Sequence, residues 1–374
     1  MNISYKYIFI VFFFFLFIVC RSEQSVSQHQ GKTHDNRHAN HNNEKFNAKE
    51  LIFDHIKDSY GWHIATYKDH HITIPLPIII YSNDSGLHIF SSSQFHHGHN
   101  TFRNFYIADK GPYAGQIVEL RPDGSEIKPL DLSITKNVLS IFVSVFLMFL
   151  VFIPIANRYK KYPMEAPKGI QSFFEPVILF VRDDIARPAI GEEKYQRFMP
   201  YLLSIFFFIW FNNMMGLIPI FPGGANVTGN ISVTMTLAMF TFFTTAINGN
   251  KHYWKEIYNA PGIPWWMKVP LPLMPIIEFL GLFTKPFTLT IRLFANISAG
   301  HIIALAFFSL IFILGNINPL LGFISSPITV IFTVFMAMLE LLVAAIQAFV
   351  FTLLSALYFG MAVAEHHGEH EKDH

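Results

Sequence analysis

Long apolar segments decide what this chain of 374 residues can fold into. A helix needs roughly 20 apolar residues to cross a bilayer, and segments of about that length or longer recur after residue 137. The predicted spans are residues 138–156, 201–220, 231–247, about 274–314 and about 327–363. The lipid core holds no water for exposed backbone groups, so such segments form helices. We therefore predict an all-α polytopic membrane protein with five membrane-crossing helices.

Composition agrees with a membrane protein and excludes several other classes. Hydrophobic residues make up 52% of the chain and charged residues 14%, whereas roughly 25% of residues in soluble domains are charged. The net charge of +1 gives no indication of nucleic-acid binding. Cys20 is the single cysteine, which excludes a disulfide framework and a cysteine metal site.

The N-terminal part has the pattern of an exported segment. Lys6 precedes an apolar run that ends at Cys20, which predicts a signal peptide over residues 1–20, with a retained membrane anchor as the alternative. Residues 21–45 are rich in His and Asn, and we expect them to be disordered.

Residues 46–134 resemble neither the apolar spans nor the polar segment before them. The stretches HHITIPLPIIIYS (70–82) and GQIVELRPDGSEIKPL (115–130) indicate strands, the second with a turn at Pro122–Gly124. If the signal peptide is correct, this small β-rich domain lies outside the cytoplasm. We assign residues 135–365 to a membrane domain and residues 366–374 to a polar C-terminal tail.

Charge and length give an orientation for the spans. The first span ends in Arg158, Lys160 and Lys161, which places that end and the C-terminal tail in the cytoplasm. Residues 169–185 predict an amphipathic helix at the interface. The last two apolar segments are longer than the bilayer is thick, so we expect long and strongly tilted helices. Strongly tilted helices would suit packing against a curved partner surface in the membrane.

The last two segments carry polar residues at membrane depth, where an ionised side chain costs several kcal/mol. They are Glu278, Arg292, Asn296, His301, Glu340 and Gln347, with Lys285 beside Pro286. At about 100° per residue, Arg292, Asn296 and Ala299 share one stripe, and His301 lies on the opposite face. Because Arg stays charged at any physiological pH, Arg292 predicts a function more strongly than the other residues do.

The final segment offers matching polar residues. Gln347 lies two helical turns beyond Glu340 on nearly the same face, beside small alanines that permit close helix approach. We expect Glu340 to lie near His301, and Gln347 near Arg292. The alternatives are that Asn296 and Gln347 only hydrogen-bond between helices, and that His301 and Glu340 form a structural pair.

Ion translocation is the chemistry that fits these residues. His titrates near neutrality and a buried Glu can do so, whereas Arg292 can attract a carboxylate and repel a passing cation. The other classes lack their patterns, since the two halves show no inverted repeat of a secondary transporter and the spans hold no hydrolase motif. The histidine spacings are too loose to predict a metal site.

Two motifs carry a resemblance to a known family. PFTLTIRLFANISAGH, from Pro286, resembles the signature R-L-F-x-N-x-x-A-G of subunit a of the bacterial-type F-type ATP synthases, and ELLVAAIQAFVF, from Glu340, resembles the motif on that family's last helix. The resemblance covers about residues 138–365. It implies a stationary proton-channel subunit of the cell inner membrane, without covalent chemistry or cofactor.

The resemblance also implies roles and partners. Arg292 matches the essential arginine, Asn296 and Gln347 its polar neighbours, and Glu278 an acidic position. His301 and Glu340 match the outside half-channel, and in some members these two residue types exchange places. The implied partners are the c-ring with its membrane carboxylate, the subunit b stalk, membrane lipid and protons. The resemblance does not cover residues 46–134.

Overall fold

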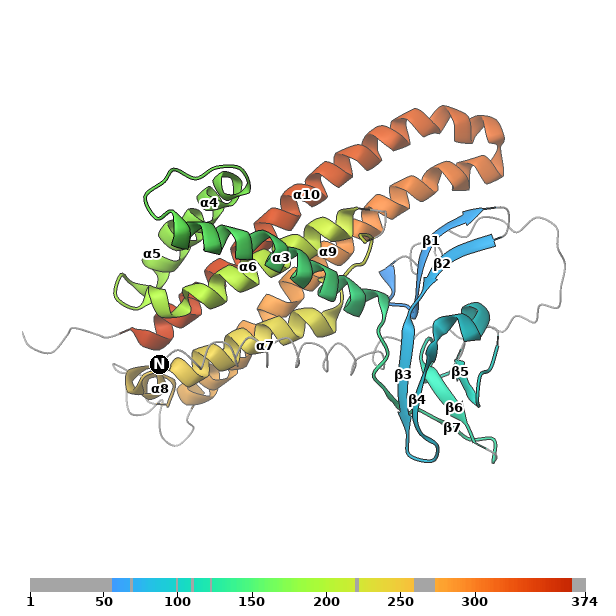
Figure 1. Ribbon diagram of the computed structural model, residues 1–374, viewed down its shortest axis with the longest axis horizontal. Helices are drawn as coiled ribbons and strands as arrows, with labels where there is room; N and C mark the ends of the chain where they lie inside the picture. Colours follow the sequence, from blue (N-terminus) through green and yellow to red (C-terminus); the bar gives the residue numbers. More distant parts are fainter. Residues whose placement is uncertain are drawn as a thin grey trace, which may run out of the picture. The chain divides into compact units, whose positions relative to one another are not determined.

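The computed structural model describes residues 56–67, 70–98, 100–108, 111–121, 123–218, 222–258 and 273–364 (Figure 1). The predicted signal peptide 1–20, the predicted disordered segment 21–45 and the tail 366–374 lie outside these residues. Contacts divide the chain into two compact units. The first contains the residues up to Val143 with Met214–Val233 and Ile297–Leu342, and the second contains Ser144–Asn213, Thr234–Asn296 and the residues from Val343 onward.

The first unit begins with a region of short antiparallel strands. They are β1 (Gly61–Tyr67), β2 (His70–Pro75), β3 (Pro77–Ser82), β4 (Gly86–Ser91), β5 (Phe105–Ile107), β6 (Ile117–Leu120), β7 (Glu126–Ile127) and β8 (Leu130–Asp131), with the 3-10 helix η1 (Ser92–Gly98) after β4. They form sheets with the orders β1-β2, β4-β3-β8 and β5-β6-β7. The predicted β-rich character of this region is therefore present in the structure.

Alternation along β3 builds the core of this region. Ile78 and Ile80 are fully buried and contact Phe95 and Phe105, while the residues between them point the other way. The predicted strand over residues 70–82 is in fact two strands. Pro75 and Pro77 flank the break, and proline supplies no backbone N–H to continue a ladder.

Among the residues that the structure describes, five helices are long and apolar enough to cross a membrane, as the sequence predicted. They are α3 (Lys136–Lys161), α6 (Tyr195–Leu217), α7 (Ile231–Asn248), α9 (Leu273–Ile317) and α10 (Pro319–Val363). The short helix α8 (Lys251–Tyr258) lies between α7 and α9 in the sequence. Together these elements make the described chain mostly helical, in agreement with a polytopic membrane protein.

The predicted interfacial helix over residues 169–185 consists of three elements. It forms α4 (Ile170–Phe180), then the π-helical turn η2 (Val181–Ala186), then α5 (Arg187–Ile190). Phe174 is buried, with its ring centroid 5.4 Å from that of Phe152 on α3 and 5.9 Å from that of Phe207 on α6. Phe173 is 65% exposed. Apolar side chains on α4 therefore face both its neighbours and the surroundings.

The connection between α9 and α10 differs from the prediction. The predicted spans ended near residue 314 and began near residue 327, yet Asn318 alone separates the two helices (Figure 1). Its side-chain oxygen accepts a hydrogen bond from the Leu320 N–H at 2.9 Å, and Pro319 suits the first helical position. A Cβ on Gly322 would lie 2.6 Å from the Cα of Gly315, so glycines permit the helix ends to meet.

Asp58 attaches the strand region to the start of α3. Its Oδ1 accepts hydrogen bonds from the backbone N–H groups of Ser59 and Asn137, both at 3.0 Å. The Lys136 N–H donates to the Ser59 carbonyl oxygen at 2.9 Å. A carboxylate at this position satisfies backbone donors that the first turn of a helix leaves free.

Candidate functional site

An ion pair between α9 and α10 is the clearest polar feature at membrane depth in the first unit. His301 Nδ1 lies 2.6 Å from Glu340 Oε1, and the side chains are 16% and 7% exposed. The predicted proximity of these two residues is therefore confirmed. Their burial in an apolar protein requires each to have the other as partner, because an unpaired charge there would be strongly destabilising.

Glycines leave the space that this pair occupies. A Cβ on Gly300 would lie 3.2 Å from Glu340 Oε1, tighter than most side-chain contacts. A Cβ on Gly216, at the end of α6, would lie 3.6 Å from His301 Nε2. Nearby, the Ser298 hydroxyl donates to the Gly229 carbonyl oxygen at 3.3 Å, which ties α9 to the segment before α7. Small residues and backbone polar groups therefore surround the pair.

The face of α10 that carries Gln347 is buried and lined by small side chains. Gln347 is 5% exposed, and Ala344 and Ala348 are almost completely buried. Asn213 on α6 donates from Nδ2 to the Ala344 carbonyl oxygen at 3.2 Å, within the second unit. Asn213 was not predicted from the sequence, although an Asn pair inside the apolar run IWFNNMM is a visible signal. No described contact joins Gln347 to Arg292, so their proximity stays a prediction.

Arg292 occupies a different environment on α9. Its side chain is half-buried, and Asn296 and Ala299 on the same stripe are exposed. Among the described residues of the second unit, ion pairs involve Arg182, Arg187 and His252 on their shorter helices, and none involves Arg292. Within the described part of the second unit, Arg292 therefore has no carboxylate partner.

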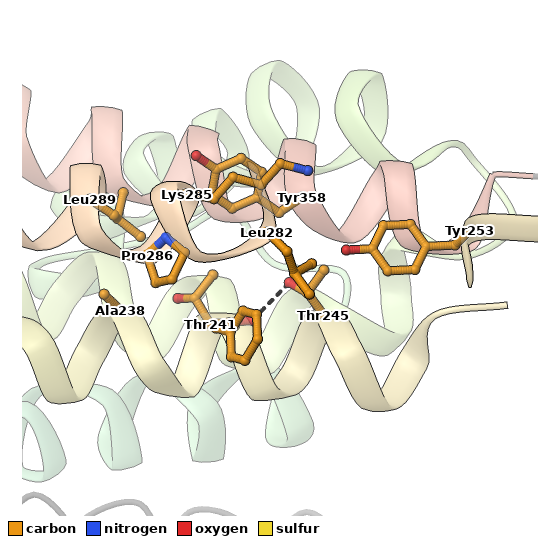
Figure 2. Close-up of a pocket in the computed structure, with 10 residues that line it drawn as sticks. Ala238, Thr241, Thr245, Tyr253, Leu282, Lys285, Pro286, Leu289 and Tyr358 are labelled. Atoms are coloured by element: carbon orange, nitrogen blue, oxygen red, sulfur yellow. Dashed lines mark hydrogen bonds between the residues drawn. The ribbon is translucent and has the colours of Figure 1, made fainter. Parts of the chain in front are cut away.

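Glu278, the remaining predicted site residue, and Lys285 lie toward the start of α9. Glu278 is exposed, and it interacts electrostatically with Lys285 two turns later. The Lys285 Nζ lies 5.6 Å from the centre of the Tyr358 ring on α10. Lys285, Tyr358 and the α8 residue Tyr253 line one cavity (Figure 2), and Tyr253 and Tyr358 were not recognised from the sequence.

Charged residues outside the spans gather after α4. Arg182 donates to both carboxylate oxygens of Asp183 at 2.8 Å, and Arg187 Nη1 lies 2.9 Å from Asp183 Oδ1. The hydrogen bond from Arg182 holds the pKa of Asp183 below its usual range. Within the described residues, no group of three or more His, Cys, Asp or Glu side chains is placed to hold a metal ion. The histidines of residues 21–45 lie outside that part of the chain.

Comparisons with known proteins cover nearly all of the described chain. A family model described as ATP synthase A chain matches residues 138–360, and a second, described as Domain of unknown function (DUF8433), matches residues 51–135. The first match contains all six predicted site residues.

Curated relatives agree with the first match. ATP synthase subunit a of Chloroherpeton thalassium is 41% identical over 257 residues, which cover 67% of this chain and 72% of that protein. ATP synthase subunit a 2 of Chlorobaculum tepidum is 42% identical over 254 residues, covering 66% and 68%. ATP synthase subunit a of Myxococcus xanthus is 42% identical over 254 residues, covering 66% and 78%.

Proposed function

Because the chain belongs to the ATP synthase A chain family, we infer that it is the proton-channel subunit of the Fo sector of an F-type ATP synthase. The observation that carries this function is the match over residues 138–360, which includes both polar helices. A proton channel agrees with five membrane-crossing helices that carry ionisable groups at membrane depth. Neither the family match nor the relatives support an independent secondary transporter.

The buried ion pair supports a role in taking up protons. An imidazole and a carboxylate 2.6 Å apart can each bind or release a proton, and each change alters the charge that its partner faces. A proton from outside would bind to the pair, and a proton would leave it toward a carboxylate of a rotating ring of small subunits. His301 and Glu340 would then line the outside half-channel, as the family resemblance implies.

Arg292 supports a role in separating the two half-channels. A guanidinium stays protonated, so Arg292 cannot relay a proton. It would instead attract a ring carboxylate passing the exposed stripe and favour its ionised form. The positive charge would also oppose the direct passage of cations between the half-channels. The exposed Asn296 and Ala299 would leave room for the ring to approach.

Charge distribution supports an orientation in a bacterial inner membrane. Arg158, Lys160 and Lys161 lie in the last turn of α3, and this positive charge supports a cytoplasmic position for that helix end and for the C-terminus. The strand region before α3 would then lie outside, consistent with a signal peptide over residues 1–20. The chain would contribute no covalent chemistry, and ATP would be made by partner subunits. The c-ring and a subunit b stalk are the proposed partners in Fo.

The function is tested by substituting Arg292 in the assembled complex. Arg292→Ala should abolish ATP-driven proton pumping in inverted membrane vesicles, while ATP hydrolysis by the detached soluble sector continues. Arg197→Ala, which alters an exposed arginine at the start of α6, is the control and should pump normally. Unimpaired pumping by Arg292→Ala in complexes that retain all their subunits would refute the proposed function.

A further inference from the structure

The sheet β4-β3-β8 in the strand region has apolar side chains on both of its faces. Its inner face carries Ile78 and Ile80, which form the core of the region with Phe95 and Phe105. An antiparallel sheet commonly has one apolar face on the core and one polar face in water. The outer face of this sheet therefore needs an explanation, and the family match over residues 51–135 supplies none.

The strand register places the exposed apolar side chains next to one another. Tyr81 on β3 is directly opposite Leu87 on β4 and Leu130 on β8, and Ile79 is directly opposite Ile89. Directly opposite residues of paired strands point to the same face. Tyr81, Leu87, Ile89 and Leu130 are 47%, 59%, 64% and 60% exposed. We call these four residues, together with the partly buried Ile79, the apolar outer face.

The apolar outer face contains no charged side chain. The remaining outward residues of β3 and β4 are Pro77 and Ser91, which are opposite each other. Asp131 on β8 is opposite Ile80 and so points to the inner side, where its carboxylate accepts a hydrogen bond from the Tyr60 hydroxyl. A contiguous exposed apolar patch of this kind marks contact with another molecule or with a membrane.

This sheet is attached closely to a membrane-crossing helix. The Leu132 N–H donates to the Ile79 carbonyl oxygen at 2.8 Å, and the Ile134 N–H donates to the Pro77 carbonyl oxygen at 3.0 Å. Helix α3 begins at Lys136, two residues later. The chain from Leu132 to Lys136 spans at most about 14 Å and paired strands are about 5 Å apart, so Ile79 lies within about 20 Å of the start of α3. The apolar outer face is therefore held near the membrane surface that α3 enters.

The size of the apolar outer face argues against a second copy of the chain as its partner. Four side chains that are about half exposed present on the order of 500 Å², the size of an ordinary surface patch. Each partner of a stable protein–protein interface contributes about 800 Å². A bilayer needs no such minimum, because α3 already holds the sheet at its surface and binding is then intramolecular.

A cation lies beside this face. Lys128 lines a hollow that also contains Leu130 of the apolar outer face. The two carboxylates of the hollow have partners, since Asp84 is paired with Arg121 at 2.7 Å and Glu119 accepts hydrogen bonds from two serine hydroxyls. No ion pair joins Lys128 to a described residue. A lysine next to an apolar face suits the phosphate groups that lie above the hydrocarbon of a bilayer.

We propose that the apolar outer face of the β4-β3-β8 sheet docks on the lipid bilayer, in the interfacial layer of the leaflet where α3 begins. Leu87, Ile89 and Leu130 lie against the upper acyl chains, and the Tyr81 ring lies at the level of the headgroups, as amphipathic aromatic rings do. Lys128 contacts lipid phosphate. The proposal requires α3 to cross the membrane and does not depend on the proton-channel function.

The test places a fluorophore on this face in the complete complex, in vesicles of phosphatidylethanolamine and phosphatidylglycerol. Cys20→Ser removes the native cysteine, and Ile89→Cys then supplies the labelling position, with Thr101→Cys as the control because Thr101 is exposed and lies outside the sheet. Cys20→Ser alone gives the background from other subunits. One quencher is a nitroxide on the lipid acyl chain near the headgroup, and the other is iodide in the water.

Each outcome identifies what covers the face. The lipid nitroxide should quench the label at position 89 at least about twofold more than the label at position 101, and iodide should quench it less. Protection from both quenchers would show that protein covers the face, from a second copy or another subunit, and would overturn the proposal. Quenching by iodide alone would show a face in water and would overturn it as well.

A second measurement excludes insertion of the label by itself. In the chain labelled at position 89, Leu130→Asp places a charge two strands away from the label and should reduce quenching by the lipid nitroxide about twofold or more. Leu120→Asp alters an exposed leucine of another sheet and is the matched control. Both leucines are exposed, so neither change disturbs the core. Unchanged quenching in Leu130→Asp would mean that the label inserts alone, and the proposal would fail.

The phosphate contact has its own variant. Lys128→Glu should reduce quenching by the lipid nitroxide by a smaller factor than Leu130→Asp does, because the apolar contacts remain. Lys128→Arg keeps the charge and should restore the original quenching. Equal quenching in Lys128→Glu and the unaltered chain would remove Lys128 from the docking surface.

Discussion

The His301–Glu340 pair of the first unit and Arg292 of the second unit differ in whether an ionisable side chain at membrane depth has a partner within the chain. His301 and Glu340 lie 2.6 Å apart and are largely buried, so each group has its partner within the chain. Arg292 precedes His301 by nine residues on α9, is half-buried and forms no ion pair with a described residue of its unit. A closed pair can store and exchange a proton, whereas an open charge can act on a group from another molecule. Burial and pairing within the chain, more than residue type, therefore distinguish the His301–Glu340 pair from Arg292.

The largest effect on ATP-driven pumping should come from giving Arg292 a carboxylate partner on its own helix. Asn296→Asp places a carboxylate four residues after Arg292 on the same face, where it can pair with the guanidinium. The arginine would then no longer favour ionisation of a passing carboxylate. We expect ATP-driven pumping to fall more than about tenfold, as a charge-assisted hydrogen bond of the usual strength would produce. Vesicle acidification measures it, and normal pumping would show that Arg292 does not need to be free.

A matched control keeps this result interpretable. Phe294→Asp adds the same charge two residues after Arg292, at a position on the opposite side of α9 where the carboxylate cannot reach the guanidinium. It should reduce pumping less than Asn296→Asp. Equal losses in the two variants would mean that any added carboxylate damages the helix.

A smaller effect on pumping is expected from exchanging the two residue types of the His301–Glu340 pair. His301→Glu combined with Glu340→His keeps both groups in contact, whereas His301→Ala or Glu340→Ala leaves one buried group without a partner. The double exchange should retain several-fold more pumping than either single variant, measured in the same vesicles. A double variant as inactive as the singles would contradict a role as an exchangeable pair.

A milder change tests the space around the pair. Gly300→Ala would bring a Cβ to 3.2 Å from Glu340 Oε1, which forces the carboxylate to shift by a few tenths of an ångström. We expect about a twofold to threefold loss of passive proton flux, less than a full hydrogen bond is worth. Gly281→Ala on the same helix, where a Cβ meets no atom within 4 Å, is the control. Equal behaviour of the two variants would remove the glycine from the explanation.

The smallest effect should appear in stability alone. Asn213→Leu removes the hydrogen bond to the Ala344 carbonyl oxygen and should lower the free energy of unfolding by about 1 kcal/mol. Thermal unfolding of the purified complex measures it. Ser204→Ala, whose hydroxyl bonds only within its own exposed helix turn, should have a smaller effect. A large loss of pumping in Asn213→Leu without a loss of stability would instead place Asn213 in the path.

Predictions from the sequence were correct where one pattern, such as a long apolar run, dominated a segment. Apolar length predicted the five long helices among the described residues, and two motifs predicted that His301 and Glu340 lie close together. Apolar length failed at residues 315–326, which lie between the two predicted spans and yet are helical except for Asn318. There, the cap by Asn318 and the contact of Gly315 with Gly322 permit the helices to continue to the turn.

The missed residues share a physical reason. Tyr253 lies in a stretch of polar and aromatic residues between two predicted spans, and its burial is against Leu282 and Ala362, which are far away in the sequence. Asn213 acts through a backbone carbonyl of another helix, which no motif records. Contacts between distant segments determine both residues, whereas His301 and Glu340 could be paired from two motifs in advance.

The tight turn between α9 and α10 also constrains how the protein is made. Each helix has 45 residues and is therefore about 68 Å long, roughly twice the hydrocarbon core of a bilayer. His301 leaves the ribosome before Glu340, and at about 5 to 20 residues per second the 39 residue additions from one to the other take about 2 to 8 seconds. During this interval the histidine has no partner. The two helices are thus best inserted together as one hairpin, so that the ion pair forms before either side chain meets lipid.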